Sequence, residues 1–203
     1  MPPQMRANPA ASYDRAVQAA LLETGLPGFK EVLDYTFYDS TDISTGETDS
    51  TTLFQTPTNN LATSNFYGQG SMPAGQAFLV RSLRIIPAMQ TAAADVGALN
   101  RGLLVSFLLE NAKKYVEGLA QFFPPGIGLT YEDVAGTVAS IAVGLSTANN
   151  GVPALNNVYK FTRPVVLRTL QPFQITLRAL APTLVATTRV FVAIDGVFVR
   201  NTI

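Results

Sequence analysis

The chain has 203 residues, a length that suits one domain, and its 14 basic and 14 acidic side chains give a formal net charge of zero. This balance does not favour nucleic acid or an anionic membrane as a partner. The sequence has no cysteine and no histidine, which excludes disulfides, thiolate metal sites, cysteine nucleophiles and the commonest general base. Charged residues make up only 14% of the chain against a usual share of about 25%. We expect partners to cover part of the surface; the alternative is a core-rich domain whose surface carries Ser, Thr, Asn and Gln.

The first residues predict an arm followed by a short helix. Residues 1–10 are rich in proline and small side chains and are expected to be irregular. Ser12 can cap a helix that ends at Gly25 and Pro27. Because this helix has only about three turns, it needs a surface to pack on, either its own domain or a neighbouring subunit. The candidate subunit contacts are Tyr13, Val17, Leu21 and Leu22. We assign residues 1–28 to this arm and amphipathic helix.

Residues 29–203 predict one all-β domain, an antiparallel β-sandwich, because apolar segments of strand length alternate with turn signals. Strands are predicted over residues 29–37, 76–87, 113–123, 157–170, 173–178 and 186–194. Residues 102–109 predict either a strand buried on both faces or a short core helix. Residues 91–102 are expected to form a connection that is broken at Gly97 and Asn100.

Local signals in the second half add detail to this prediction. Pro164 inside a predicted strand indicates an edge or a bulge, because proline cannot donate to a sheet ladder. Asp195 and Gly196 predict a two-residue hairpin turn, from which residues 197–200 return as a strand. A short helix is expected near residues 131–138, where alanine and glycine leave helix and strand both open.

Residues 38–52 predict a long, polar and exposed loop. Its candidate ligands for Ca²⁺ are Asp39, Asp42, Glu47 and Asp49. Their spacing does not match the EF-hand loop, so a solvated loop is the preferred interpretation and no metal site is assigned.

Charge is distributed unevenly along the chain. The stretch from Glu31 to Asp49 carries acids without Lys or Arg, whereas Asp195 is the only acid from Lys160 onward. This pattern reflects either chance placement or complementary pairing, within a subunit or between neighbours. Both explanations stay open at the level of sequence.

The sequence contains no recognisable catalytic motif. GxSxG, GxGxxG and the Walker loop are absent. The adjacent carboxylates of Glu132 and Asp133 point in different directions on any regular element, so they do not form a converging pair. We therefore expect a protein that is not an enzyme and has no cofactor and no small-molecule substrate.

Strand-and-turn patterns carry a resemblance to a known family. They are the run KFTRPVVLRTLQPFQITLRAL, the following RVFVAIDGVFVR, and NFYGQGSMPAGQAFLVRSLRIIP upstream. Over roughly residues 50–203 the chain resembles the single-jelly-roll major capsid proteins of tailless icosahedral bacteriophages, including membrane-containing ones. The Ala/Gly-rich residues 134–151 have no counterpart in this family pattern.

The resemblance implies an eight-stranded jelly roll that self-assembles with copies of itself into the icosahedral capsid of a virion. The copies would form pentameric or hexameric capsomers. Other virion proteins would be partners, and a genome or an internal membrane would lie beneath the shell.

Two alternatives belong to other functional classes. A virion spike, fibre-head or decoration protein of the same architecture would attach to a receptor through the loops at residues 38–75 and 124–157. A carbohydrate-binding sandwich would present Tyr35, Tyr38 and Tyr67, although the tryptophan that such platforms favour is absent.

Overall fold

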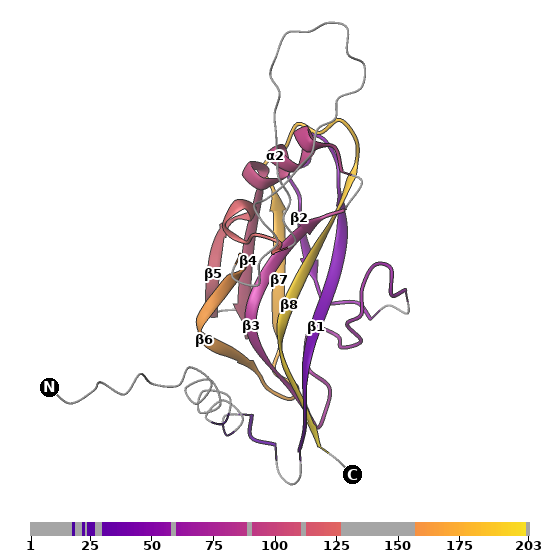
Figure 1. The fold of residues 1–203 in the computed structure, drawn as a ribbon. Coiled ribbons are helices and arrows are strands. Elements are labelled where there is room, and N and C mark those ends of the chain that lie inside the picture. The colour runs from indigo at the N-terminus through magenta and orange to yellow at the C-terminus, as the bar shows by residue number, and fades with distance from the viewer. Residues whose placement is uncertain are drawn as a thin grey trace, which may run out of the picture.

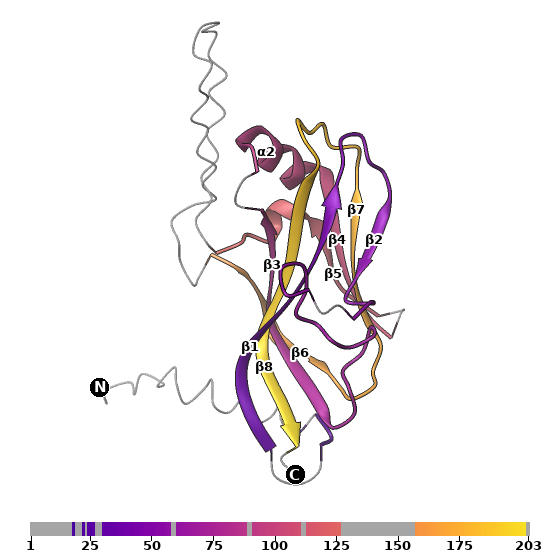
Figure 2. The same cartoon turned by 90° about the vertical axis from the view of Figure 1, so that its right-hand side faces the viewer.

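The computed structural model describes residues 30–57, 60–88, 91–110, 113–126 and 157–201, together with residues 18, 22 and 24–26. They form a sandwich of two four-stranded antiparallel sheets (Figures 1 and 2). The first sheet contains, in spatial order, β1 (Lys30–Ile43), β8 (Thr188–Asn201), β3 (Gln76–Pro87) and β6 (Tyr159–Leu167). The second contains β2 (Ser50–Leu53), β7 (Phe173–Ala179), β4 (Leu103–Leu109) and β5 (Lys113–Leu119). This confirms the predicted all-β class.

The first described strand in the sequence pairs with the last, the second with the seventh, and so on toward the middle of the chain. β1 pairs with β8, β2 with β7, β3 with β6 and β4 with β5, in each case antiparallel. Among the described strands, only β4 and β5 are sequence neighbours within one sheet. Every other connection therefore passes from one sheet to the other.

The core lies between the sheets and is rich in phenylalanine. Strand β4 alternates between buried and half-buried side chains, the period of two expected for a sheet with one face on the core. Phe37 contacts Phe78 and Phe66 with ring centroids 4.9 and 5.3 Å apart. Phe66 in turn contacts Phe173, on the opposite sheet, at 5.4 Å. Each such ring contributes roughly 1.5–3 kcal/mol through burial, so this cluster links the two sheets.

In the described connections between strands lie two short helices. The helix α2 (Ala93–Gly102) precedes β4, and the 3-10 helix η1 (Ala120–Phe122) follows β5. The expected broken connection at residues 91–102 was wrong, because tertiary packing overrides the low helix propensity of Gly97 and Asn100. Val96 and Leu99 of α2 are 3% and 1% exposed, so the helix closes one end of the core.

The predicted acidic loop over residues 38–52 was also wrong in extent. Strand β1 continues to Ile43, and β2 begins at Ser50. The polar residues belong to a strand because β8 supplies a long apolar partner in continuous register. Ile43 itself is buried in the core.

The predicted hairpin at Asp195 and Gly196 does not exist. Both residues lie inside β8, between β1 and β3. The register of β3 against β8 shifts between Val80 and Ser82, which marks a bulge at this point. A β-carbon on Gly196 would lie 1.9 Å from the carbonyl oxygen of Leu79. The glycine therefore permits close backbone approach inside a sheet instead of forming a turn.

Other predictions are confirmed. Residues 76–87 form β3 as expected, and residues 103–109 form a strand and not a helix. Pro164 lies on β6, at the edge of its sheet, within an irregular stretch of the pairing with β3. The expected arm at residues 1–10 and the expected helix near residues 131–138 lie outside the described residues. Neither α2 nor any other described helix has the length and hydrophobicity of a membrane span.

Candidate functional site

The acidic and basic ends of the chain meet across β1 and β8. Glu31 lies directly opposite Arg200, and Asp42 opposite Arg189. The guanidinium Nε of Arg200 donates to Glu31 Oε2 at 2.5 Å. Arg189 donates from Nε and Nη2 to the two carboxylate oxygens of Asp42 at 2.8 and 2.9 Å. These two pairs therefore show complementary charge within one subunit, and they support the register between β1 and β8.

Electrostatics at Asp42 follow from this contact. The hydrogen bonds from Arg189 lower the pKa of the Asp42 carboxyl below its usual value of 3.8. The same contact raises the pKa of Arg189. The side chains of Arg189 and Asp42 are 41% and 50% exposed, so water screens the pair and it contributes little stability.

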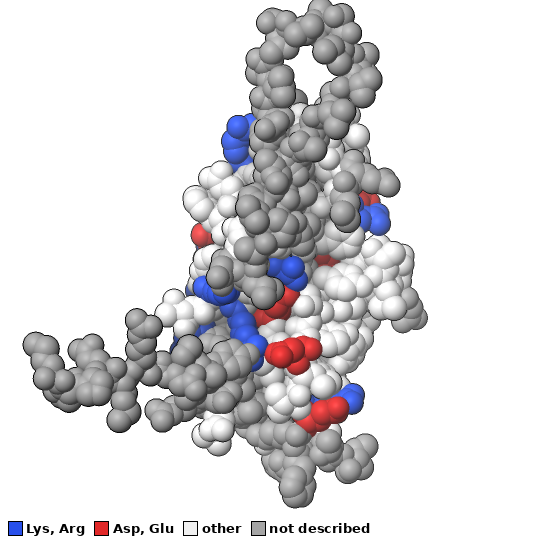
Figure 3. Space-filling model, viewed as in Figure 1, with Lys and Arg blue, Asp and Glu red and all other residues white. Residues whose placement is uncertain are grey.

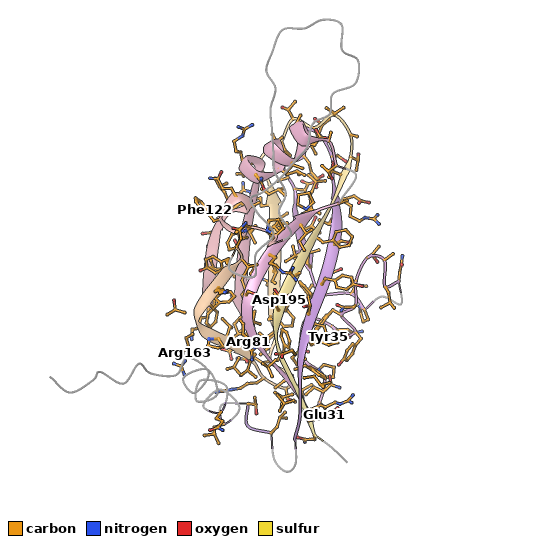
Figure 4. All side chains as sticks on the ribbon, in the orientation of Figure 1. Glu31, Tyr35, Arg81, Phe122, Arg163 and Asp195 are labelled. Carbon is orange, nitrogen blue, oxygen red and sulfur yellow. The ribbon has the colours of Figure 1, made fainter. Side chains whose placement is uncertain are left out.

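A denser polar cluster lies on the outer face of the first sheet, around Asp195. Its carboxylate accepts hydrogen bonds from the hydroxyls of Thr36 and Ser82, both at 2.7 Å. Arg84 donates to it from Nε at 2.8 Å and Nη2 at 2.6 Å. Figure 4 shows Asp195 at the middle of the sheet. We call these four residues the Asp195 cluster; it ties β1, β3 and β8 together and was not predicted.

Charged side chains continue along this face. Arg81, at the bulge, donates to Asp34 Oδ1 at 3.0 Å. Figure 3 shows Lys and Arg gathered over the β3 and β6 side, with acidic side chains beside them toward β8 and β1. Arg81, Arg84 and Arg189 each bond an acidic side chain on another strand of the first sheet, so these charges hold strands together.

The candidate Ca²⁺ ligands do not share a site. Asp39 accepts from the backbone N–H groups of Ser40 and Phe54, at 2.9 and 2.6 Å. Asp42 binds Arg189, and Glu47 accepts from the N–H of Ser44 at 2.7 Å. Asp49 lies immediately before β2. Within the described part of the chain, no group of three acidic side chains is placed to hold a metal ion.

A second apolar cluster covers part of the outer face of the first sheet. Leu26 packs with Ala77 and Leu79 of β3 and with Val197 and Val199 of β8. Thr24 is also buried, whereas Leu22 is 83% exposed. The segment that follows the predicted helix therefore lies on its own sandwich. The candidate contacts Tyr13, Val17 and Leu21 lie outside the described residues.

The free edge of β1 is partly covered by the segment between β2 and β3. Asn65 Oδ1 accepts from the N–H of Tyr38 at 2.7 Å, and Asn65 Nδ2 donates to the carbonyl of Thr36 at 2.8 Å. The N–H of Asn65 donates to the carbonyl of Tyr38 at 3.1 Å. This single residue thus bonds the strand edge as a neighbouring strand would.

Closer to its start, β1 is exposed. Val32, Leu33 and Tyr35 are 44%, 39% and 41% exposed, and the side chain of Asp34 is 83% exposed. Figure 4 shows Glu31 and Tyr35 along this end of the strand. Exposed apolar side chains on an edge strand are typical of a contact surface.

The opposite end of the sandwich also presents apolar side chains. Phe122, Leu180 and Val185 are 58%, 44% and 80% exposed. The loop that carries Val185 is held in place, because Asp95 of α2 accepts from the N–H of Val185 at 2.7 Å. These side chains are therefore displayed on an ordered surface.

A hollow lies between the edges of β5 and β6. It is lined by Leu109, Glu110, Lys113, Tyr115, Arg163, Pro164, Val166, Arg168 and Gln171. Gln171 donates to Glu110 at 2.6 Å, and the Lys113 ammonium lies 5.0 Å from the centre of the Tyr115 ring. The lining thus combines Lys113, Arg163 and Arg168 with the carboxylate of Glu110.

The tyrosines of the carbohydrate alternative do not form one platform. The Tyr38 hydroxyl donates to the carbonyl of Leu61 at 2.5 Å, and the Tyr67 hydroxyl to Gln76 at 2.5 Å. Burial raises the pKa of Tyr67. Tyr38 lies on the outer face of its strand and Tyr35 on the opposite one, because side chains alternate along a strand.

Comparison of the sequence with models of protein families and with curated proteins finds no match.

Proposed function

We propose that this protein is a jelly-roll subunit that self-assembles into the icosahedral shell of a virus. The observation that carries the proposal is the strand order β1-β8-β3-β6 facing β2-β7-β4-β5. An eight-stranded antiparallel hairpin gives this order when it is rolled up into two facing sheets, and jelly rolls of this kind are common in viral capsids. Because jelly rolls also occur in lectins and cupins, the surfaces must decide among functions.

Charge and exposed apolar surface support assembly over a role as a monomer. Charged residues make up only 14% of the chain, and several of them are paired within the subunit, as Arg84 is with Asp195. Apolar side chains are exposed at both ends of the sandwich, at Val32 and Val185 among others. A shell buries the sides of every subunit against neighbours, so such surfaces suit it.

The rest of the proposal follows the resemblance of the sequence to phage capsid proteins. Copies of the chain would be the main partners, in pentameric or hexameric capsomers. Other virion proteins and an inner membrane or genome would lie against the shell. The virion would be the site of action, and the chain would be a structural protein without catalytic activity.

Electron microscopy of the purified protein tests the proposal. Closed shells or rings of five or six subunits are the expected result. Trimers would favour the spike or fibre-head alternative, because such attachment proteins form small discrete oligomers and are present in fewer copies per particle.

A further inference from the structure

The main-chain groups of β1 show which positions face its free edge. Asn65 bonds the carbonyl of Thr36 and both the N–H and carbonyl of Tyr38. Strand groups alternate in direction with a period of two, and the register of β1 against β8 is continuous. The N–H and carbonyl groups of Lys30, Val32 and Asp34 therefore also point to the free edge.

This part of the edge is open to a partner. Within the described residues, β8 is the only strand paired with β1, and the contacts of Asn65 start at Thr36. Val32 is 44% exposed and the Asp34 side chain 83% exposed. An open edge of this kind can accept another strand through main-chain hydrogen bonds.

We propose that two copies of this chain join through residues 30–34 of β1, antiparallel about a two-fold axis at Val32. The inference rests on the proposed function, because it names one contact between shell subunits. Val32 lies opposite Val32 of the second copy, and Lys30 opposite Asp34, twice by symmetry. The sheet that contains β1 in one copy and the same sheet of the second copy then become one continuous sheet across the pair.

Charge complementarity selects this register. The two neighbouring two-fold registers also place edge-facing groups opposite each other. One is centred on residue 31 and sets Glu31 against Glu31, which is unfavourable. The other is centred on residue 33 and sets Val32 against Asp34; it also brings Lys30 to Thr36, whose edge carbonyl is already bonded by Asn65. Of the three, only the register centred on Val32 sets Lys30 against Asp34 at both ends. It also places Leu33 opposite Glu31, whose carboxylate is already bonded to Arg200 of its own subunit.

A single cysteine tests the geometry cleanly, because the chain contains none. Opposed residues in a hydrogen-bonded antiparallel pair have Cα atoms about 5.5 Å apart, within the range a disulfide spans. We expect Val32→Cys to give a disulfide-linked dimer under mild oxidation on a non-reducing gel. Tyr35→Cys is the matched control, with a similar exposure of 41%. In the proposed register two copies of residue 35 are about 20 Å apart and do not link.

A charge swap tests the register independently. In the Val32→Cys background, Lys30→Glu places like charges opposite each other and should reduce the dimer yield about fivefold. Adding Asp34→Lys restores the opposite charges and should restore the yield.

The possible results distinguish failure of the β1 contact from failure of the proposed function as a shell subunit. Linked dimers without larger assemblies support the β1 contact and contradict the proposed function. Shells in which Val32→Cys does not link, or links no better than Tyr35→Cys, overturn the β1 contact alone. A chain that stays monomeric and unlinked at all concentrations overturns both.

Discussion

Arg84 of β3 reaches diagonally to Asp195 of β8, with two hydrogen bonds of 2.6 and 2.8 Å between guanidinium and carboxylate. Their side chains are 20% and 27% exposed, so water screens the pair only in part. The hydroxyls of Thr36 and Ser82 donate hydrogen bonds to the same carboxylate. This arrangement stabilises the middle of the outer sheet, where the bulge at Arg81 interrupts the regular ladder.

Replacing Asp195 with alanine should lower the free energy of unfolding by about 2–3 kcal/mol, because Arg84 and two hydroxyls lose their acceptor. Urea unfolding at neutral pH measures the change. Asp34→Ala is the control, since it also removes a carboxylate from an arginine but at a site that is 83% exposed; its effect should stay below about 1 kcal/mol. Equal losses from both variants would show that the Asp195 cluster has no special role.

Gly196→Ala should destabilise the protein by about 3 kcal/mol or more, because the added methyl would overlap the Leu79 carbonyl oxygen at 1.9 Å. Thermal unfolding of both proteins gives the difference. Gly118→Ala on β5 is the matched control: its β-carbon would lie 3.4 Å from Phe122, an ordinary contact. That variant should be neutral or slightly stabilised. A tolerated Gly196→Ala would mean that β8 does not approach β3 this closely.

Asn65→Ala should leave the carbonyl of Thr36 and the N–H of Tyr38 without their partner at the edge of β1. The variant loses both side-chain hydrogen bonds, of 2.7 and 2.8 Å, at a cost of about 1–3 kcal/mol. Hydrogen exchange of the Tyr38 amide measures the effect directly, because that N–H donates to the missing side chain. An unchanged exchange rate in the variant would contradict the assigned contact.

The pair of Asp42 and Arg189 predicts a pH dependence. The folded protein holds the pKa of Asp42 below its usual value of 3.8, so its stabilisation is fully present above that value. It is lost as the pH falls through the lower folded pKa. Asp42→Asn should therefore lower the free energy of unfolding at neutral pH by less than about 1 kcal/mol. The difference from the parent protein should shrink as the pH falls below 3.8. A difference that persists undiminished in acid would rule out an ionic origin.

The sequence predicts strands well where one face is apolar with a period of two, as at Phe173, Ile175 and Leu177 in β7. It fails where long-range partners decide the structure. Residues 38–43 look like a loop locally but pair with β8, which is more than a hundred residues away. Asp195 and Gly196 carry a turn signal, yet both lie inside β8. The bulge on β3 accounts for the glycine, and the hydrogen-bond donors around the Asp195 carboxylate account for the aspartate.

The candidate contacts show the same limit. Helical spacing indicates an apolar face at Tyr13, Val17 and Leu21 but cannot identify its partner. The open edge at Val32 could not be predicted, because it depends on which strand lies outermost in the sheet and on where Asn65 stops covering it. A signal was nevertheless present: Lys30, Val32 and Asp34 alternate in a charged–apolar–charged pattern that is complementary to itself when reversed.

The mass of the purified chain in solution, measured by light scattering over a range of concentrations, shows whether the protein assembles. Masses of closed shells, or of discrete pentamers or hexamers, are expected, against a subunit mass of 21.7 kDa. A mass of one subunit at every concentration would contradict the proposed assembly.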